Sequence, residues 1–199
     1  MKKTVLISAC LGILISICIC ADFMKTEETI SESVVRLHVR ANSDSAIDQK
    51  LKLKVRDRIL KETEQLFSEQ DNIEDVRNII NENIDIIKKV AKDEIKENGY
   101  SYNVSVQYGK SDFPTKSYGD ICLPAGTYEA LIVNIGEGKG QNWWCVLFPP
   151  LCFVNETCVE VPVKSGEVIE KNIGTKNYEL LQGKKPKIKF KLYEWWVNR

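Results

Sequence analysis

The stretch VVRLHVRANSDSAID, residues 34–48, decides the fold, because a strict alternation gives way in it to a cluster of capping residues. Over 34–41, apolar side chains occupy one set of alternate positions and basic side chains the other. The apolar set is Val35, Leu37, Val39 and Ala41, and the basic set is Arg36, His38 and Arg40. A period of two predicts a half-buried strand whose basic face is turned away from the core.

The residues that follow this strand predict the start of a helix. Asn42, Ser43, Asp44 and Ser45 are all capping types, and Asp48 follows Ser45 at the three-residue spacing of a capping box. Apolar residues then recur at four-residue steps, at positions 47, 51, 55 and 59. The stretch KLKLKVR at 50–56 also fits a strand, but the caps and the total length favour a helix over about 45–67.

A second helix is predicted over 71–98. Its apolar stripe has helical spacing, and Gly99 stands where a helix C-terminal glycine belongs. The stripe consists of Ile73, Val76, Ile80, Ile84, Ile87 and Ala91.

From residue 100 onward the period changes to that of strands. Residues 100–109 alternate, 128–135 are rich in β-branched residues, and the glycine-rich 136–142 leads into WWCVLF at 143–148. The last two runs predict a hairpin over 128–148. KPKIKFKLYEWW at 185–196 predicts a closing strand or an amphipathic terminal element. The sum is an α+β fold in the order strand, helix, helix, strands, with two helices packed on one mainly antiparallel sheet.

The N-terminus is expected to lie outside that fold. Lys2 and Lys3 precede Thr4–Ala21, which carries no charge. A basic start followed by an apolar run is typical of a secretory signal, and 18 residues is also at the short end of a membrane span. The sequence therefore predicts an export signal at 1–21, either a signal peptide or a membrane anchor. A polar linker at 22–33 and one domain at 34–199 follow.

Composition argues against nucleic acid as a partner. The chain has 28 basic and 28 acidic side chains, so its formal net charge is zero. Nucleic-acid binding would require a basic patch and a high isoelectric point.

Four cysteines fall within the predicted domain, at positions 122, 145, 152 and 158. In an oxidising compartment they allow three full pairings, among which sequence cannot choose. Cys145 and Cys152 flank Phe148-Pro149-Pro150, where the backbone should turn, so a short-loop disulfide between them is a candidate. A four-cysteine zinc site is the rival, but the paired C-x-x-C knuckles are missing. No metal and no cofactor are predicted.

Few residues of this sequence could form a nucleophilic catalytic site, because His38 is the only histidine. A Cys145–His38 pair is the one hydrolase that can be assembled from these residues. The two neighbouring arginines oppose the protonated state that a general base must reach, which favours a structural or partner-facing His38. No catalytic residue is predicted.

Adjacent tryptophans at 143 and 144 must point to opposite faces of a strand. One is expected to enter the core beneath the helices. The other either lies exposed, as a binding anchor, or is covered by the segment around 160 or by Trp195-Trp196.

Three blocks of this sequence resemble the stage II sporulation protein R family of endospore-forming bacteria. They occur in the family's order and at its spacing, behind a similar short leader. The blocks are RLHVRANSDSAIDQKLKLKVRD at 36–57, FPTKSYGDICLPAGTYEAL at 113–131 and IGEGKGQNWWCVLFPPLCF at 135–153.

The resemblance implies a signal and not an enzyme. Members of the family are exported from the forespore into the space between its two surrounding membranes. There they are thought to activate a membrane-bound aspartic protease of the mother cell, which matures the pro-form of sigma factor E. On this reading the membrane is contacted only through the N-terminal segment, if that segment is not cleaved. The alternative is a small secreted Cys-His hydrolase.

The resemblance assigns no contact residues, so the candidates are positional. They lie on the basic face of the first strand, in the loop after it and in the tryptophan pair. The partner-binding candidates are Arg36, His38, Arg40, Asn42, Asp44, Trp143 and Trp144.

Overall fold

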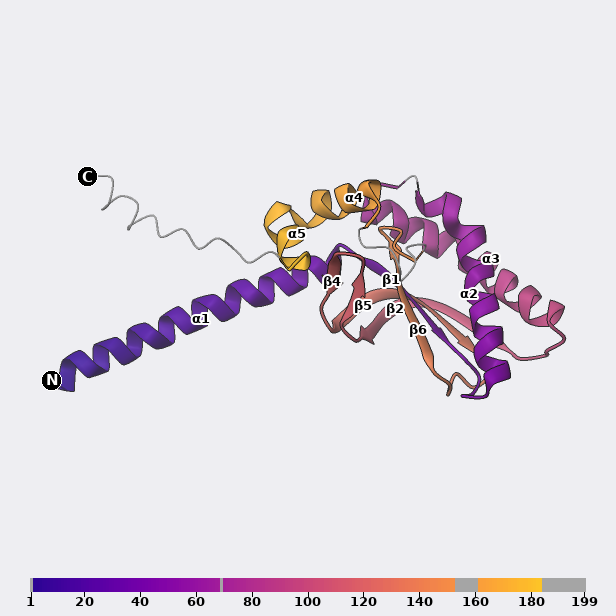
Figure 1. The fold of residues 1–199 in the computed structure, drawn as a ribbon, viewed down its shortest axis with the longest axis horizontal. Helices are drawn as coiled ribbons and strands as arrows, with labels where there is room; N and C mark the ends of the chain where they lie inside the picture. The colour runs from indigo at the N-terminus through magenta and orange to yellow at the C-terminus, as the bar shows by residue number, and fades with distance from the viewer. Residues whose placement is uncertain (1, 69, 153–160, 184–199) are drawn as a thin grey trace.

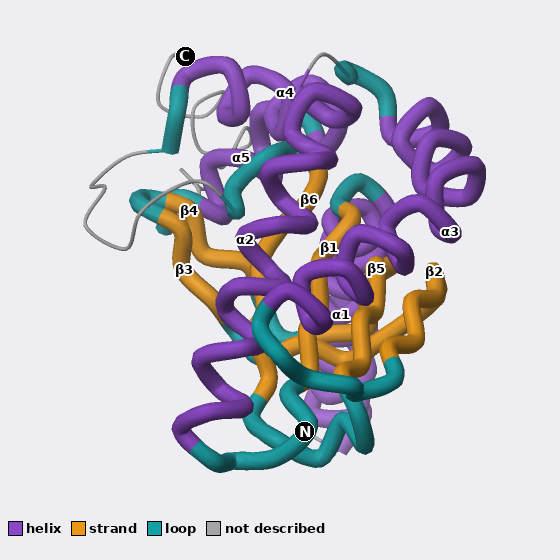
Figure 2. Tube along the Cα trace, turned by 90° about the vertical axis from the view of Figure 1, so that its right-hand side faces the viewer, coloured by secondary structure: helices purple, strands orange, loops and turns teal. Residues whose placement is uncertain are grey.

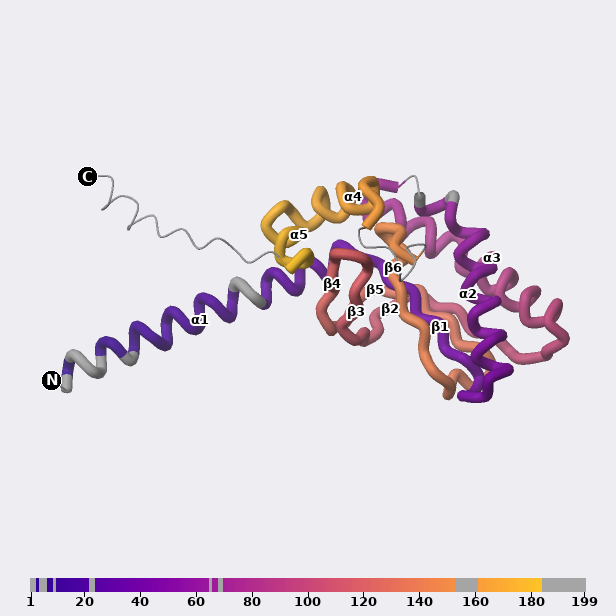
Figure 3. The backbone as a smooth tube through the Cα atoms, viewed as in Figure 1, coloured from indigo at the N-terminus to yellow at the C-terminus, as the bar shows by residue number. Residues whose placement is uncertain are grey.

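The computed structural model describes residues 2–68, 70–152 and 161–183, and the predicted terminal strand at 185–196 lies outside them. Helix α1 (Lys2–Glu32) projects away from the other elements, as Figures 1 and 3 show. It includes residues 2–21 of the expected export signal and residues 22–32 of the expected linker, so the linker is helical up to Glu32. Within the described residues, no helix is both long enough and apolar enough to cross a membrane.

The main sheet has four strands in the order β2–β5–β1–β6. They are β1 (Val35–Arg40), β2 (Val104–Phe113), β5 (Gly126–Ile135) and β6 (Asn142–Phe148). β1 is parallel to β5, whereas the β1–β6 and β2–β5 pairs are antiparallel. The predicted α+β class and the mainly antiparallel sheet are confirmed.

Helices α2 (Ala46–Ser68) and α3 (Ile73–Glu97) cover one face of this sheet (Figure 2). The predicted stripe of α3 supplies the buried Val76, Ile80 and Ile87. On the same face, Arg77 of α3 donates through Nε to Oε2 of Glu129 in β5 over 2.8 Å. Both predicted helices are thus confirmed, and a partly buried ion pair supplements their apolar packing.

Smaller elements complete the domain. A ribbon of β3 (Lys116–Tyr118) and β4 (Ile121–Leu123) forms a separate two-stranded sheet. Helices α4 (Val163–Ile173) and α5 (Thr175–Leu181) follow, and Gln182 at the end of α5 donates to Oδ2 of Asp120 over 2.6 Å.

The prediction of a hairpin over 128–148 is wrong. β5 and β6 do not pair, because β1 lies between them and bonds to both. The glycine-rich stretch does begin with a turn, in which Gly138 N donates to Ile135 O over 3.1 Å, but this turn does not join two paired strands. The stretch then passes over the end of β1, where Gly140 N donates to Ala41 O over 2.9 Å.

The prediction that β1 is half-buried is also wrong. Five of its six residues are buried, including Arg36 and His38. The basic face is covered by aromatic side chains from other strands, a long-range effect that a period of two cannot reveal.

Candidate functional site

The first and third sequence blocks meet at the carboxyl end of β1. We call this region the Asn42 corner: residues 42–48 together with the loop 136–141. Asn42 Oδ1 accepts a hydrogen bond from Glu137 N over 3.0 Å, and Asp44 Oδ1 accepts one from Gln141 N over 2.8 Å. Both side chains therefore hold the backbone of the glycine-rich loop in place.

Asp48 organises the inner side of the Asn42 corner. Its Oδ2 accepts from Ser43 Oγ over 2.6 Å and from Asn42 Nδ2 over 2.9 Å, and its side chain is buried. The Ser43 hydroxyl lowers the pKa of this carboxyl, against the opposing effect of burial. One half of the predicted capping box is formed, because Ser45 Oγ accepts from Asp48 N over 3.2 Å. The other half is not, because the Asp48 carboxylate accepts from Asn42 and Ser43 instead.

Two glycines of the loop are required by this close approach. A Cβ on Gly140 would lie 2.2 Å from Ser43 O, and one on Gly136 would lie 2.2 Å from Asn42 Oδ1. Gly136 also has a φ of 59°, in the left-handed region that favours glycine. The glycines thus allow the close packing of the loop backbone against Asn42 and Ser43.

Arg36 lies at the other end of β1, on the face opposite α2 and α3. Its guanidinium carbon is 4.1 Å from the ring centre of Phe113 and 4.9 Å from that of Tyr128, and Nη2 donates to Tyr118 Oη over 3.2 Å. Nε and Nη1 are buried without a hydrogen-bond partner in the described part of the chain. Among the described residues, cation–π contacts and the Tyr118 hydroxyl surround this charge, and no carboxylate pairs with it.

His38 is the next residue on the same face. Its Nδ1 is 3.1 Å from Ser111 Oγ, its Nε2 is 2.7 Å from Asn142 Oδ1, and Arg40 Nε donates to Nε2 over 3.2 Å. Burial is the main cause that lowers the pKa of His38, with the charges of Arg40 and Arg36 adding to it and Asn142 opposing it. The surroundings of His38 therefore favour its neutral ring over the protonated one.

This shift predicts a specific pH dependence of stability. Because the folded-state pKa lies below the unfolded value of 6.5, His38 favours folding above pH 6.5, and that contribution is lost as pH falls below it. We expect His38→Gln to flatten the decrease in unfolding free energy just below pH 6.5, measured by urea titration. An equally steep decrease in the variant would contradict this origin.

The two tryptophans point to opposite faces, as predicted. Trp143 lies on the helix side, with the Arg56 guanidinium carbon of α2 4.0 Å from its ring centre. Trp144 lies on the other side, with its ring centre 5.8 Å from that of His38. Both are half-buried, so neither is the fully exposed anchor nor the fully covered core residue that the sequence allowed.

The candidate disulfide between Cys145 and Cys152 is present, with the two Cα atoms 5.2 Å apart. Cys122 is a free, exposed thiol, and Cys158 lies outside the described residues. The register places Cys145 opposite Leu37 and His38 opposite Trp144, so Cys145 and His38 point to different faces of the sheet. The hydrolase pair is therefore not formed. Among the described residues, no cluster of His, Cys, Asp or Glu could hold a metal.

The disulfide is expected to stabilise the end of β6. It closes a loop with a sequence separation of seven, which corresponds to about 2.5 kcal/mol of chain entropy. We expect the double variant Cys145→Ser, Cys152→Ser to lose about that much unfolding free energy in urea titration. Cys122→Ser is the matched control and should change it by less than about 0.5 kcal/mol; equal effects would contradict the assignment.

The seven positional candidates thus divide into three groups. Arg36 and His38 are buried and offer no surface to a partner in this conformation. Asn42 is half-buried, and both its Oδ1 and its Nδ2 are already bonded, to Glu137 N and to Asp48. The remaining four, at least partly accessible, are Arg40, Asp44, Trp143 and Trp144. That these contact a partner stays a prediction.

Sequence reasoning missed the aromatic side chains around Arg36 and the role of Asp48. Phe113, Tyr118 and Tyr128 come from three different strands, so no local pattern joins them to Arg36. In the sequence, Asp48 is distinguished only by its position three residues after the capping residue Ser45. That spacing does not reveal its bonds to Asn42 and Ser43.

Comparison with known proteins gives one consistent result. The sequence model of the family described as stage II sporulation protein R matches residues 31–158. Stage II sporulation protein R of Bacillus subtilis (strain 168) is 40% identical over 165 residues, which cover 78% of this chain and 73% of that protein. No solved structure is significantly similar to the chain.

Proposed function

Because the chain belongs to the stage II sporulation protein R family, we propose that it is an exported sporulation signal that binds a membrane-bound aspartic protease. In this proposal, binding activates the protease, which then matures the pro-form of sigma factor E in the mother cell. The protein acts from the space between the forespore and mother-cell membranes, as a ligand and not as an enzyme.

The similarity to the Bacillus subtilis protein, spread over most of both chains, is the observation that carries the proposal. Two features of the chain agree with it. The Cys145–Cys152 disulfide fits an oxidising compartment outside the cytosol. The basic start and the uncharged run of residues 1–21 follow the order of an export signal.

Activation by a ligand requires that the ligand bind the active state of the protease more tightly than the inactive one. We propose the contact at the Asn42 corner, where the exposed candidate Asp44 bonds to the loop that carries the exposed charges of Glu137 and Lys139. The hydrogen bonds to Asn42 and Asp44 hold this loop rigid, which lowers the entropy that binding would cost.

Co-purification tests the binding step. We expect the membrane protease to be retained on the tagged chain from sporulating cells. Lys139→Glu should weaken retention at least about tenfold, as one interfacial charge reversal costs more than about 1.4 kcal/mol. Lys88→Glu, an exposed charge reversal on α3, is the matched control. Retention that neither variant changes would contradict the proposed surface, and absence of the protease from all preparations would contradict the proposed function.

A further inference from the structure

Two basic side chains of α2 lie along strand β6. Lys52 Nζ donates to Gln141 O over 3.0 Å and to Gln49 Oε1 over 2.6 Å. One turn later, the guanidinium carbon of Arg56 lies 4.0 Å from the ring centre of Trp143. Four residues of helix advance about 6 Å and two residues of strand about 7 Å, so both contacts fit helix and strand running side by side. We call Lys52, Arg56 and Trp143 the Trp143 cluster.

The positive charge of the Trp143 cluster exceeds the negative charge beside it. Lys52 is only 5% exposed, and both of its acceptors are neutral. No carboxylate of the described residues forms an ion pair with it. Arg56 donates through Nε and Nη2 to Oδ1 of Asp57, whose side chain is exposed. Two cations therefore share one solvated carboxylate, and a positive charge is left in excess.

The cluster also has donors to spare. Trp143 Nε1 is buried without a hydrogen-bond partner in the described part of the chain, and Arg56 uses only Nε and Nη2 on Asp57. Burial lowers the pKa of Lys52, the charge of Arg56 adds to this effect, and Asp44 opposes them more weakly. An anion beside these groups would pair with the excess charge and accept from the unused donors.

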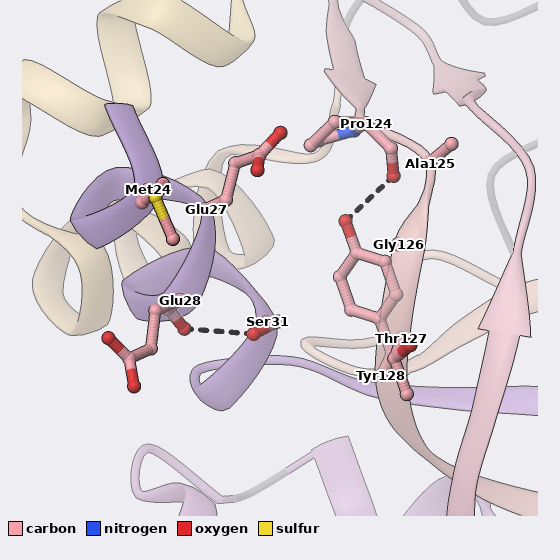
Figure 4. Close-up of a pocket in the computed structure, with 9 residues that line it drawn as sticks. All are labelled: Met24, Glu27, Glu28, Ser31, Pro124, Ala125, Gly126, Thr127 and Tyr128. Atoms are coloured by element: carbon pink, nitrogen blue, oxygen red, sulfur yellow. Dashed lines mark hydrogen bonds between the residues drawn. The ribbon is translucent and has the colours of Figure 1, made fainter. Parts of the chain in front are cut away.

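The pocket of about 240 Å³ between α1 and the corner joining β4 to β5 has the opposite charge. Glu27 and Glu28 line it and no basic residue does, as Figure 4 shows. An anion would be repelled there. The Trp143 cluster is therefore the place where the described charges favour one.

We propose that the Trp143 cluster binds a carboxylate. Arg56 Nη1 and Trp143 Nε1 donate to it, and Lys52 supplies charge from the buried side. The side chain of Arg56 is 16% exposed and Trp143 is half-buried, so the carboxylate approaches from solvent along their edge. A carboxylate carries one negative charge, which balances the excess, whereas a phosphate group carries up to about two. This inference does not depend on the proposed protease partner.

Sodium acetate is the probe for this site. The ¹⁵N-labelled full chain is titrated with it at pH 7, with sodium chloride keeping the ionic strength constant. The indole N–H signal of Trp143, assigned from Trp143→Phe, should shift in the NMR spectrum and saturate. That of Trp144, on the other face of the sheet, should move far less. Equal shifts of the two signals, or a shift that never saturates, would overturn the proposal.

Variants of the two basic residues test their separate roles. Arg56→Gln should weaken acetate binding at least about tenfold, because a hydrogen-bonded charge partner is lost. Lys52→Gln should weaken it about threefold or more through charge alone. Arg58→Gln is the matched control, since this half-buried arginine of α2 pairs with Glu62, and it should stay within about twofold of the parent chain. Equal effects of all three variants would overturn the proposal.

Thermal unfolding separates binding from a structural role of Lys52. The midpoint of the parent chain should rise in acetate relative to chloride. Lys52→Met removes the buried charge, so its midpoint in chloride should not fall, and its rise in acetate should be smaller. A lower midpoint with an unchanged rise would overturn the proposal.

A short peptide distinguishes the two sources of a carboxylate. Acetyl-Ala-Ala-Glu-Ala-Ala-amide that binds more tightly than acetate would support an acidic protein side chain as the ligand, and weaker binding would support a free carboxylic acid. The same peptide with Gln in place of Glu should not displace acetate. Displacement by the Gln peptide would overturn the assignment to a carboxylate.

Discussion

Replacing Gly140 with alanine is expected to lower the free energy of unfolding by about 3 kcal/mol, the upper range for overpacking a filled site. The new Cβ would lie 2.2 Å from Ser43 O and 2.5 Å from Ser43 C, so backbone must move. Ser43 O also accepts from Gln49 Nε2 over 2.8 Å, and a shift would break that bond. Urea titration with a fixed m-value measures the change.

Gly109→Ala is the matched control for this variant. Gly109 lies within β2 and an added Cβ would meet nothing within 4 Å. The same substitution there should be neutral or stabilise by up to about 1 kcal/mol, because alanine loses less conformational freedom on folding. Similar losses in both variants would contradict the close approach at the Asn42 corner.

Replacing Asp48 with alanine is expected to cost about 3 kcal/mol, because it leaves two hydrogen-bond donors at a largely buried site without an acceptor. These donors are Ser43 Oγ and Asn42 Nδ2, and Asn42 in turn holds the loop through Glu137 N. The loss should appear in urea titration at pH 7.

The charge of Asp48 also predicts a pH dependence. Its folded-state pKa lies below the unfolded value of 3.8, so its contribution is present above pH 3.8 and is lost as pH falls toward the folded value. Asp48→Ala should remove that part of the acid sensitivity.

Asp57→Ala is the control for Asp48→Ala on the same helix. Asp57 is exposed and pairs only with its neighbour Arg56 among the described residues. A surface pair of this kind contributes less than about 1 kcal/mol, so the variant should be close to the parent chain. Equal losses of unfolding free energy in Asp48→Ala and Asp57→Ala would contradict the structural role given to Asp48 at the Asn42 corner.

Local sequence signals were sufficient to predict helices α2 and α3. The apolar stripe and Gly99 mark α3, and Ser45 marks the start of α2 where KLKLKVR alone fits a strand. The Cys145–Cys152 disulfide was a candidate because the two cysteines flank a turn, but the sequence left the choice among three pairings open.

Other features depend on contacts that sequence spacing does not encode. The hairpin prediction failed because β1, more than 80 residues earlier in the chain, occupies the position between β5 and β6. The basic face of β1 was expected at the surface, yet Phe113, Tyr118 and Tyr128 cover Arg36 from distant strands.

Helices α4 and α5 were not predicted. α4 contains Gly166, which weakens a helix prediction. The structure explains the glycine, since a Cβ there would lie 2.6 Å from Tyr178 Oη of α5. The spacing of Val168, Ile169 and Ile173 was the available signal.

In the proposed function, this chain activates a protease by docking to it from outside the membrane. The most direct measurement adds the purified, disulfide-bonded chain to the receptor protease reconstituted in vesicles, with the pro-form of sigma factor E on the protease-domain side. We predict that cleavage rises with added chain and saturates, that unfolded chain has no effect, and that Lys139→Glu requires a higher concentration. Protease that stays inactive at saturating folded chain, or that cleaves equally well without it, would contradict the account.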